Sequence, residues 1–249
     1  MDFELITLFP EPVEAMAAVG VTGRALAGDS HRLRCWNPRD FAEGRYRRVD
    51  DRPYGGGPGM VMLAEPLLRT LAAIRADRVA QAKPVLPVIH LSPQGTPLVQ
   101  ARLPALASRP GAILLCGRYE AIDQRFLDAH VDEEISIGDF VVSGGELPAL
   151  MLIDAILRLV PGTLNDPLSA QQESFADGLL DCPHYTRPES LDGEAVPPVL
   201  LSGDHAAIAA WRRSRAIATT AARRPDLFEA AVRAGRVDSP GKGGAGRRG

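Results

Sequence analysis

Residues 132–148 read DEEISIGDFVVSGGELP and carry three kinds of segment in succession. A short apolar strand is predicted over 134–137, a loop with three glycines follows it, and a strongly apolar helix is predicted over 146–160. Pro161 and Gly162 end that helix. Ser143 and Glu146 have the Ser-x-x-Glu spacing of a helix capping box. A strand followed by a loop and a helix is the repeating unit of a parallel α/β sheet.

Two stretches upstream repeat this succession of strand and glycine-containing loop. An apolar strand predicted over 85–91 leads into LSPQG (91–95), and one predicted over 111–116 leads into CGRYE (116–120). Open α/β sheets bind ligands beyond the carboxyl ends of their strands, so the three loops predict one shared pocket. Further strands are predicted over 5–9 and 33–36, and further helices over 65–79 and 118–130.

A fourth glycine-rich stretch, DDRPYGGGPGM, lies nearer the amino terminus over 50–60. Its glycines allow the backbone to come close to a ligand, although a mobile surface loop would have the same composition. The stretch lacks the Gly-Lys-Ser/Thr ending of a phosphate-binding loop and the GxGxxG spacing of a dinucleotide fold. These differences disfavour a nucleotide-binding enzyme of either kind.

Composition places the chain among soluble globular proteins. Of its 249 residues, 45% are hydrophobic, yet no apolar run approaches the ~18 residues that span a bilayer. The first residues lack the basic region of a signal peptide, so we expect a cytoplasmic protein with no membrane association. The 3 cysteines form no CxxC pair, which argues against a disulfide framework or a zinc knot.

Charge is unevenly distributed although the net charge is only −3. Seven arginines stand against four acidic residues between His31 and Arg52, and five against one between Asp204 and Arg224. A polyanion responds to local clusters of charge at short range, so both stretches are candidates for contact with nucleic acid. A solvated face is the alternative for each.

The character of the sequence changes after Gly162, and this predicts four parts. An α/β domain is expected over 1–162, a polar flexible linker over 163–175, a small helical domain over 176–238, and a disordered, glycine-rich tail over 239–249. Within the helical domain, helices are predicted over 204–222, with Asp204 as N-cap, and over 226–234.

Six motifs now stand in order: DDRPYGGGPGM, LSPQG, CGRYE, DEEISIGDFVVSGGELPAL, GLLDCPHYTRPE and VPPVLLSGDH. Together they resemble the bacterial tRNA (guanine-N1)-methyltransferase family of the SPOUT superfamily, from about residue 5 to residue 224. The resemblance implies an α/β parallel sheet whose chain forms a deep trefoil knot, followed by the small C-terminal helical domain. It also implies a homodimer with its active sites at the interface.

The implied activity is transfer of a methyl group from S-adenosylmethionine to N1 of guanosine 37, just 3′ of the anticodon in tRNA. Two alternatives remain: a SPOUT methyltransferase for another RNA site, and an RNA-binding protein that keeps the fold without catalysis. The two C-terminal motifs favour methylation of guanosine 37 over another RNA site, and the intact donor loops disfavour an RNA-binding protein without catalysis. The resemblance also implies a magnesium ion, for which the sequence shows no ligand cluster.

By the same resemblance, S-adenosylmethionine is held by residues of the three loops. Glycines there expose backbone to the adenine, and a carboxylate of Glu120 or Asp139 would favour the sulfonium cation. A favourable charge at a helix N-terminus is the alternative role for Glu120. The implied donor contacts are Leu91, Ser92, Pro93, Gly117, Arg118, Tyr119, Glu120, Ser136, Ile137, Gly138, Asp139, Phe140, Val141, Val142, Gly144, Gly145 and Pro148.

Two residues match the catalytic positions of the family. Guanine N1 carries a proton at neutral pH, so a base must remove it while a cation stabilises charge that grows toward O6. Arg158 matches the family's arginine, and Glu173 stands where the family has an aspartate, one methylene shorter. Asp177 is a rival for the role of base, and Arg158 has an ion pair with Asp154 or a phosphate contact as alternatives.

RNA recognition is expected from the second domain and from the stretch 50–60. Arg212 and Arg215 lie three apart on a predicted helix and suit backbone phosphates. His184, Tyr185 and Arg187 offer stacking and hydrogen bonds to splayed bases. Ordinary packing is the alternative for Tyr185, and Trp211 is expected in the core of that domain.

Overall fold

The structure is a computed structural model that describes residues 1–166, 169–170 and 172–238. The chain separates into two compact units, Met1–Asn165 and Asp166–Gly249. The tail predicted over 239–249 and three residues of the predicted linker (167, 168 and 171) lie outside the described residues.

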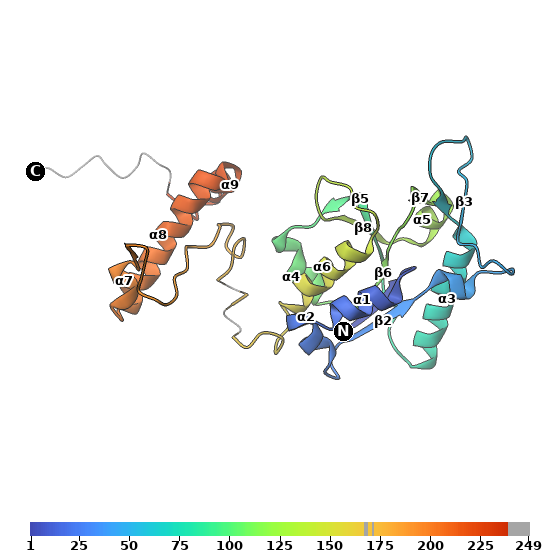
Figure 1. Ribbon diagram of the computed structural model, residues 1–249, viewed down its shortest axis with the longest axis horizontal. Coiled ribbons are helices and arrows are strands. Elements are labelled where there is room, and N and C mark those ends of the chain that lie inside the picture. Colours follow the sequence, from blue (N-terminus) through green and yellow to red (C-terminus); the bar gives the residue numbers. More distant parts are fainter. Residues whose placement is uncertain (167–168, 171, 239–249) are drawn as a thin grey trace, which may run out of the picture. The chain divides into compact units, whose positions relative to one another are not determined.

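The first unit is built on a five-stranded parallel sheet (Figure 1). The strands lie in the order β2-β1-β6-β5-β8, and each neighbouring pair is parallel. The predicted α/β class with a parallel sheet is therefore confirmed. The strands are β1 Asp2–Ile6, β2 Arg32–Trp36, β5 Val88–Pro97, β6 Gly111–Leu115 and β8 Glu133–Ser136.

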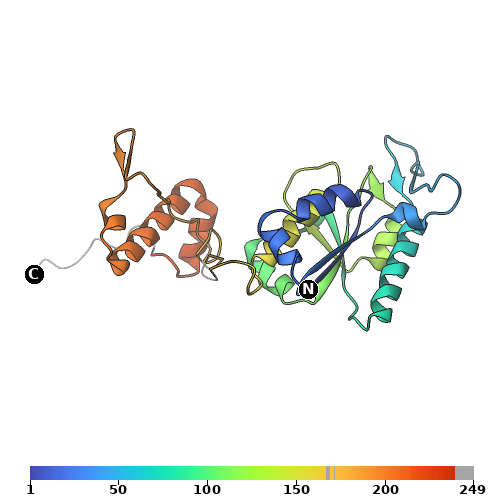
Figure 2. The same cartoon turned by 60° about the horizontal axis from the view of Figure 1, so that its bottom comes forward.

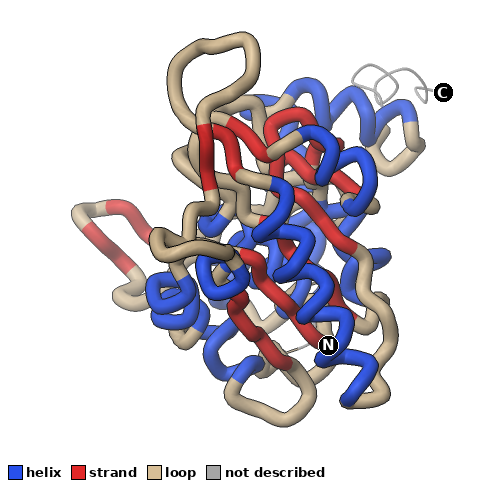
Figure 3. The backbone as a smooth tube through the Cα atoms, turned by 90° about the vertical axis from the view of Figure 1, so that its right-hand side faces the viewer, coloured by secondary structure: helices blue, strands red, loops and turns tan. Residues whose placement is uncertain are grey.

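Helices cover both faces of this sheet, as Figures 1 and 3 show. On β6, Ala112 and Leu114 belong to one buried cluster, while Ile113 and Leu115 belong to the other, because successive strand residues point to opposite faces. The first cluster includes side chains of α1 Pro10–Ala17, α2 Gly20–Leu26, α4 Leu103–Ala107 and α6 Glu146–Leu157. The second includes α3 Ala64–Ala80 and α5 Gln124–His130. Two short 3₁₀ turns, η1 Pro38–Phe41 and η2 Gln100–Arg102, complete the unit.

A second, three-stranded sheet was not predicted. It consists of β3 Asp50–Asp51, β4 Val61–Met62 and β7 Ala121–Ile122 in that order. The glycine-rich stretch thus forms the connection between β3 and β4, and β4 pairs with the chain that follows CGRYE. The Glu120 N–H donates to Met60 O at 2.9 Å, which fixes the end of that connection beside the CGRYE loop.

The helix predicted over 118–130 is wrong in its first half. Tyr119 has φ +61°, and residues 121 and 122 pair with β4, so the chain is extended where a helix was expected. The helix α5 begins only after Asp123, whose side chain accepts a hydrogen bond from the Arg125 N–H. Nonlocal strand pairing here overrides the local helical pattern.

Other boundaries also differ from prediction: β5 covers 88–97 instead of 85–91, and α6 ends at residue 157 instead of 160. β1 covers 2–6 instead of 5–9, because Pro10 opens α1 and the chain leaves the sheet before it. The capping box is also wrong: Gly145 is the N-cap of α6, and no side chain caps it. The Glu146 carboxylate is instead buried against Thr7 and Arg118.

The second unit is small and mainly helical. It contains a hairpin of β9 Ser190–Leu191 and β10 Glu194–Ala195, then α7 Pro198–Leu201, α8 His205–Arg223 and α9 Pro225–Arg233. Figure 2 shows the hairpin projecting from the helices of this unit. Asp204 accepts hydrogen bonds from the Ala206 and Ala207 N–H groups, both at 3.0 Å, so its predicted role as N-cap of α8 is confirmed.

Two predictions about the whole chain can be compared with the described residues. The three cysteines are free thiols, as the absence of a CxxC pair indicated. No helix in the described part of the chain is long and apolar enough to cross a bilayer.

Candidate active site

The LSPQG segment forms an arch in the middle of β5. Leu91 and Thr96 both pair with Ile135 of β8, so the four residues between them bulge out of the ladder. A Cβ atom at Gly95 would lie 2.4 Å from the Ile135 N atom, which no side chain allows. Glycine at this position therefore lets the arch lie directly against the neighbouring strand.

The loop after β6 lies against the loop that precedes α6. The Gly145 N–H donates to Gly117 O at 2.9 Å, and a Cβ atom at Gly145 would lie 2.7 Å from the Cys116 Cα. The two backbones are in direct contact here, so the absence of a side chain is a packing requirement. This contact brings the ends of CGRYE and of the loop over 136–145 together.

A buried hydrogen-bond network holds these loops in place. Arg118 Nε donates to Glu146 Oε2 at 2.9 Å, and Arg118 Nη1 donates to Ser143 O at 3.2 Å. Thr7 Oγ1 donates to the other carboxylate oxygen of Glu146 at 2.9 Å. Because Glu146 is only 6% exposed, its carboxylate requires these hydrogen-bond partners. Arg118 thereby links two of the loops through its contacts with Glu146 and Ser143.

The three loops together enclose a cavity of about 360 Å³ at the carboxyl ends of β5, β6 and β8. All of the donor contacts implied by the resemblance line this cavity except Asp139. Of the two carboxylates considered for the sulfonium, Glu120 lines the cavity and Asp139 does not. The lining also includes residues that sequence reasoning missed: His90, Gln94, Ala121, Ile122, Gln124, Leu127, Glu134, Ile135 and Ser143.

Apolar side chains line one part of this cavity without being buried by the protein itself. Phe140, Val141 and Val142 are 53%, 84% and 39% exposed, although they belong to the loop that lines the cavity. Exposed apolar side chains in a concave site usually mark a ligand. The residues present thus fit a group with a flat apolar ring and a cationic centre, with Glu120 as the nearby acid.

His90 is a buried polar residue of this cavity. It is 9% exposed, and its Nδ1 has no hydrogen-bond partner among the described residues, with Glu134 Oε2 at 3.7 Å. Burial lowers the pKa of His90, and the Glu134 carboxylate opposes that shift. Since burial is the larger influence, the ring is neutral near pH 7. A lone histidine on an apolar strand resembles a core residue, so the sequence alone gave no reason to single it out.

The two predicted catalytic residues belong to different units. Arg158 is the C-cap residue of α6 in the first unit, and Glu173 lies in a turn of the second, where its carbonyl oxygen accepts from the Ala176 N–H at 3.2 Å. Asp154, a predicted partner of Arg158, accepts a hydrogen bond from Thr22 Oγ1 at 2.6 Å. The rival base Asp177 forms an ion pair with Arg213 and accepts from the Leu179 N–H at 3.2 Å. Its carboxylate therefore has a structural role.

Among the described residues, one group of three potential metal ligands lies close together. Asp181, Cys182 and His184 place their ligand atoms within 4.8 Å of one another. Thiol and imidazole ligands do not suit Mg²⁺, which prefers oxygen, so this group does not fit the magnesium ion that the resemblance implies. His184 Nε2 lies 2.8 Å from Asp181 Oδ2, and this partner lowers the pKa of Asp181 although burial opposes the shift.

The fold and the cavity define a class of protein: an α/β protein with a ligand cavity beyond the carboxyl ends of parallel strands. A family profile described as tRNA (Guanine-1)-methyltransferase TrmD matches residues 1–230. The chain belongs to this family. The family and the methyltransferase activity on guanine N1 of tRNA, which the motifs predicted, are both confirmed.

Individual relatives agree with the family profile. Proteins named tRNA (guanine-N(1)-)-methyltransferase from Methylibium petroleiphilum, Leptothrix cholodnii and Paracidovorax citrulli are 61%, 60% and 60% identical to this chain. The matches cover 95%, 94% and 96% of this chain and 94% of each relative.

Proposed function

We propose that the protein binds S-adenosylmethionine in the cavity beyond β5, β6 and β8 and methylates N1 of guanosine 37 in tRNA. The observation that carries this proposal is the convergence of three glycine-containing loops on one cavity with exposed apolar side chains. When bound, S-adenosylmethionine supplies a methyl group on a positively charged sulfur. The chain's own residues then have to orient the guanine and remove its proton.

Within the cavity, backbone and apolar groups hold the adenosine and a carboxylate stabilises the cation. The loop bearing Phe140, Val141 and Val142 would supply apolar contacts to the adenine ring, and the backbone beside Gly117 and Gly145 would supply hydrogen-bonding groups. Glu120 provides the negative charge for the sulfonium. Each of these contacts would stabilise the bound donor without itself moving a proton.

Proton removal is assigned to Glu173 and charge stabilisation to Arg158. A carboxylate near N1 accepts the proton as the methyl group arrives, and a guanidinium near O6 stabilises the charge that develops there. We assign no step to magnesium, because the one group of three potential ligands in the described chain does not fit that ion.

Each predicted domain has its own role in the proposed function. Residues 1–162 bind the donor, 163–175 form the linker that carries Glu173, and 176–238 bind tRNA. Because tRNA is the substrate, we place the enzyme in the cytoplasm. The trefoil knot at the donor loops is part of this proposal as a property that membership of the family implies.

A homodimer with active sites at its interface completes the proposal. Leu147 and Met151 lie four apart on α6 and are 57% and 54% exposed, and Met16 on neighbouring α1 is 59% exposed. An exposed apolar surface of this kind is typical of an interface. Diluting the enzyme below the dissociation constant of the dimer should abolish turnover, and an active monomer measured by light scattering would contradict this part of the proposal.

The decisive experiment is methyl incorporation from labelled S-adenosylmethionine into two tRNA transcripts that differ only at position 37. One carries guanine there and the other adenine, and nucleoside analysis identifies the product. We expect N1-methylguanosine from the first transcript alone. Donor binding without incorporation would indicate an RNA-binding protein that has lost catalysis, and methylation at another position would indicate another RNA site.

A further inference from the structure

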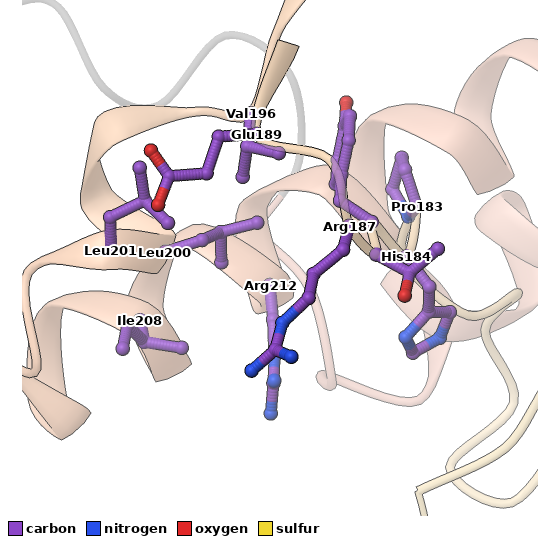
Figure 4. A pocket seen from close by; sticks show the side chains of 11 residues that line it. Pro183, His184, Arg187, Glu189, Val196, Leu200, Leu201, Ile208 and Arg212 are labelled. Atoms are coloured by element: carbon purple, nitrogen blue, oxygen red, sulfur yellow. The ribbon is translucent and has the colours of Figure 1, made fainter. Parts of the chain in front are cut away.

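The second unit contains a pocket of about 360 Å³ that the donor site does not use (Figure 4). Its walls come from residues 183–189, from the end of the β9–β10 hairpin, and from α7 and the first half of α8. The Val196 N–H donates to Glu189 O at 2.8 Å, which holds the two ends of the hairpin together. With Asp204 capping α8, the elements around the pocket are fixed by hydrogen bonds.

One part of the pocket is apolar and open. Val196, Leu200, Leu201 and Ile208 form this part, and Leu201 is 55% exposed. Tyr185, also part of the lining, is 50% exposed, with its ring 6.2 Å from the ring of Trp211. Large apolar side chains that stay exposed in a concave site favour a ligand with a flat apolar face.

Two arginines form a second, positively charged part of the pocket. Arg187 and Arg212 both line the pocket, and in Figure 4 their guanidinium groups extend toward the same side of it. Neither has a hydrogen-bond or ion-pair partner within the part of the chain that the structure describes, whereas Arg213, the next residue, pairs with Asp177. Two unpaired guanidinium groups repel each other, and a phosphate that accepts from both would remove that cost.

Glu189 adds an acceptor at the apolar end. In Figure 4 its carboxylate lies by Leu200 and Leu201, away from the two guanidinium groups. An ionised carboxylate only accepts hydrogen bonds, so its partner must present donors. The pocket therefore offers phosphate donors in one part, and in another part an apolar surface with an acceptor beside it. These are the groups that the phosphate, the base and the base edge of a nucleotide would contact.

We propose that this pocket binds one unstacked guanine nucleotide of the tRNA, distinct from the guanosine that is methylated. Among the bases, guanine alone presents two adjacent donors, N1–H and N2–H₂, on the edge that an unpaired base exposes, and a carboxylate accepts from both. A guanine held in this way has its N1 covered by Glu189, so it is not the methyl acceptor. This inference rests on the proposed function, because it takes tRNA as the ligand.

The first test measures tRNA affinity of the full chain and of three single variants. Arg187→Ala and Arg212→Ala should each weaken tRNA binding about tenfold and flatten its salt dependence by about 0.7 in the log–log slope. Arg75→Ala is the matched control, because Arg75 is an exposed arginine of α3 outside the pocket and outside both basic stretches, with no partner in the described chain. Donor affinity should stay unchanged in all three variants.

The second test asks which base the pocket reads. Saturation-transfer NMR with 5′-GMP and 5′-AMP should show preference for GMP in the wild type and loss of that preference in Glu189→Gln, about tenfold. If all three arginine variants weaken tRNA binding equally, or if GMP and AMP bind alike, the pocket is not a guanine site and an acidic peptide becomes the better ligand. A wild type that prefers GMP but transfers no methyl group would refute the proposed function and leave the pocket standing.

Discussion

The cavity beyond β5, β6 and β8 and the pocket beside α7 and α8 each enclose about 360 Å³, but they are built differently. The first is shaped by backbone in direct contact, as at Gly145 and Gly117, and its one arginine is neutralised by buried Glu146. The second is shaped by side chains, and its two arginines have no acidic partner within the described residues.

This difference fits the two kinds of ligand. A small donor of constant structure is best held by rigid backbone whose geometry is independent of rotamers, which reduces the entropy lost on binding. A polyanion is attracted by unpaired surface charge, and its affinity depends on salt for the same reason. The two sites should therefore respond to different substitutions: the first to added volume and the second to removed charge.

The largest effect is expected from Glu173, which lines neither the donor cavity nor the pocket of the second unit. Glu173→Gln keeps the shape of the side chain and removes the base, so methyl transfer should fall about 10²–10⁴-fold. Single-turnover kinetics would measure the loss, and isothermal calorimetry should show unchanged donor affinity. Asp177→Asn serves as the comparison: if it abolishes transfer in folded protein while Glu173→Gln does not, Asp177 is the base.

Arg158→Ala should slow the chemical step about 10²-fold, because a cation that stabilises developing charge acts in the transition state. The affinities for donor and tRNA should change little, so kcat carries the loss. Arg158→Lys, which keeps the charge but not the guanidinium fork, should recover part of the rate. A merely halved rate in Arg158→Ala would reduce the residue to an ion pair or a phosphate contact.

Gly145→Ala tests whether the first cavity is built from backbone. The added Cβ would lie 2.7 Å from the Cys116 Cα, so the loops must separate at a cost of about 1–3 kcal/mol, and donor affinity should fall. Gly28→Ala is the control, because its Cβ would meet only Ala25 O at an ordinary 3.7 Å. Unchanged donor affinity in Gly145→Ala would mean that the loop contact does not shape the site.

Asp204→Ala should cost about 1 kcal/mol, because it removes the side chain that caps α8. Urea unfolding of a Trp36→Phe protein would monitor the second unit through Trp211, the other of the 2 tryptophans. Weaker tRNA binding with intact donor binding should accompany the loss. A parallel loss of donor affinity would show that the two sites are not independent.

The local sequence pattern predicted the segments whose structure depends on complete burial or on neighbouring residues. Ile113 and Leu115 lie in a fully buried strand, and Asp204 caps a helix through its own neighbours, so composition was sufficient for both. The arch over Ser92–Gly95 and the strand at 121–122 depend on partners far away in the sequence, Ile135 and Val61 with Met62. No local signal specifies such pairing, and the helix predicted over 118–130 failed for that reason.

The residues of the candidate site also fall into two groups: those that local sequence patterns indicated and those that depend on how the loops pack. Motif resemblance led to the loops around the cavity, since glycines and short polar runs at strand ends are visible in sequence. It missed His90 and the contact of Arg118 with Glu146, because these depend on which way a side chain points once the loops have packed. The roles of Glu173 and Arg158 stay predictions.

The smallest effect is expected from His90, and burial of this residue determines whether its contribution to stability rises or falls with pH. The folded pKa of His90 lies below its ordinary value of 6.5, so the unfolded chain binds more protons between the two. The stability contributed by the neutral ring is fully present above pH 6.5. It is lost as the pH falls from 6.5 to the lower pKa that His90 has in the folded protein. In a Trp211→Phe background that reports the first unit through Trp36, His90→Gln should therefore lose less stability than its parent between pH 7.5 and pH 5. The exposed His205→Gln is the control, and an identical pH dependence in all three proteins would show that the effects of burial and of the Glu134 carboxylate on His90 cancel.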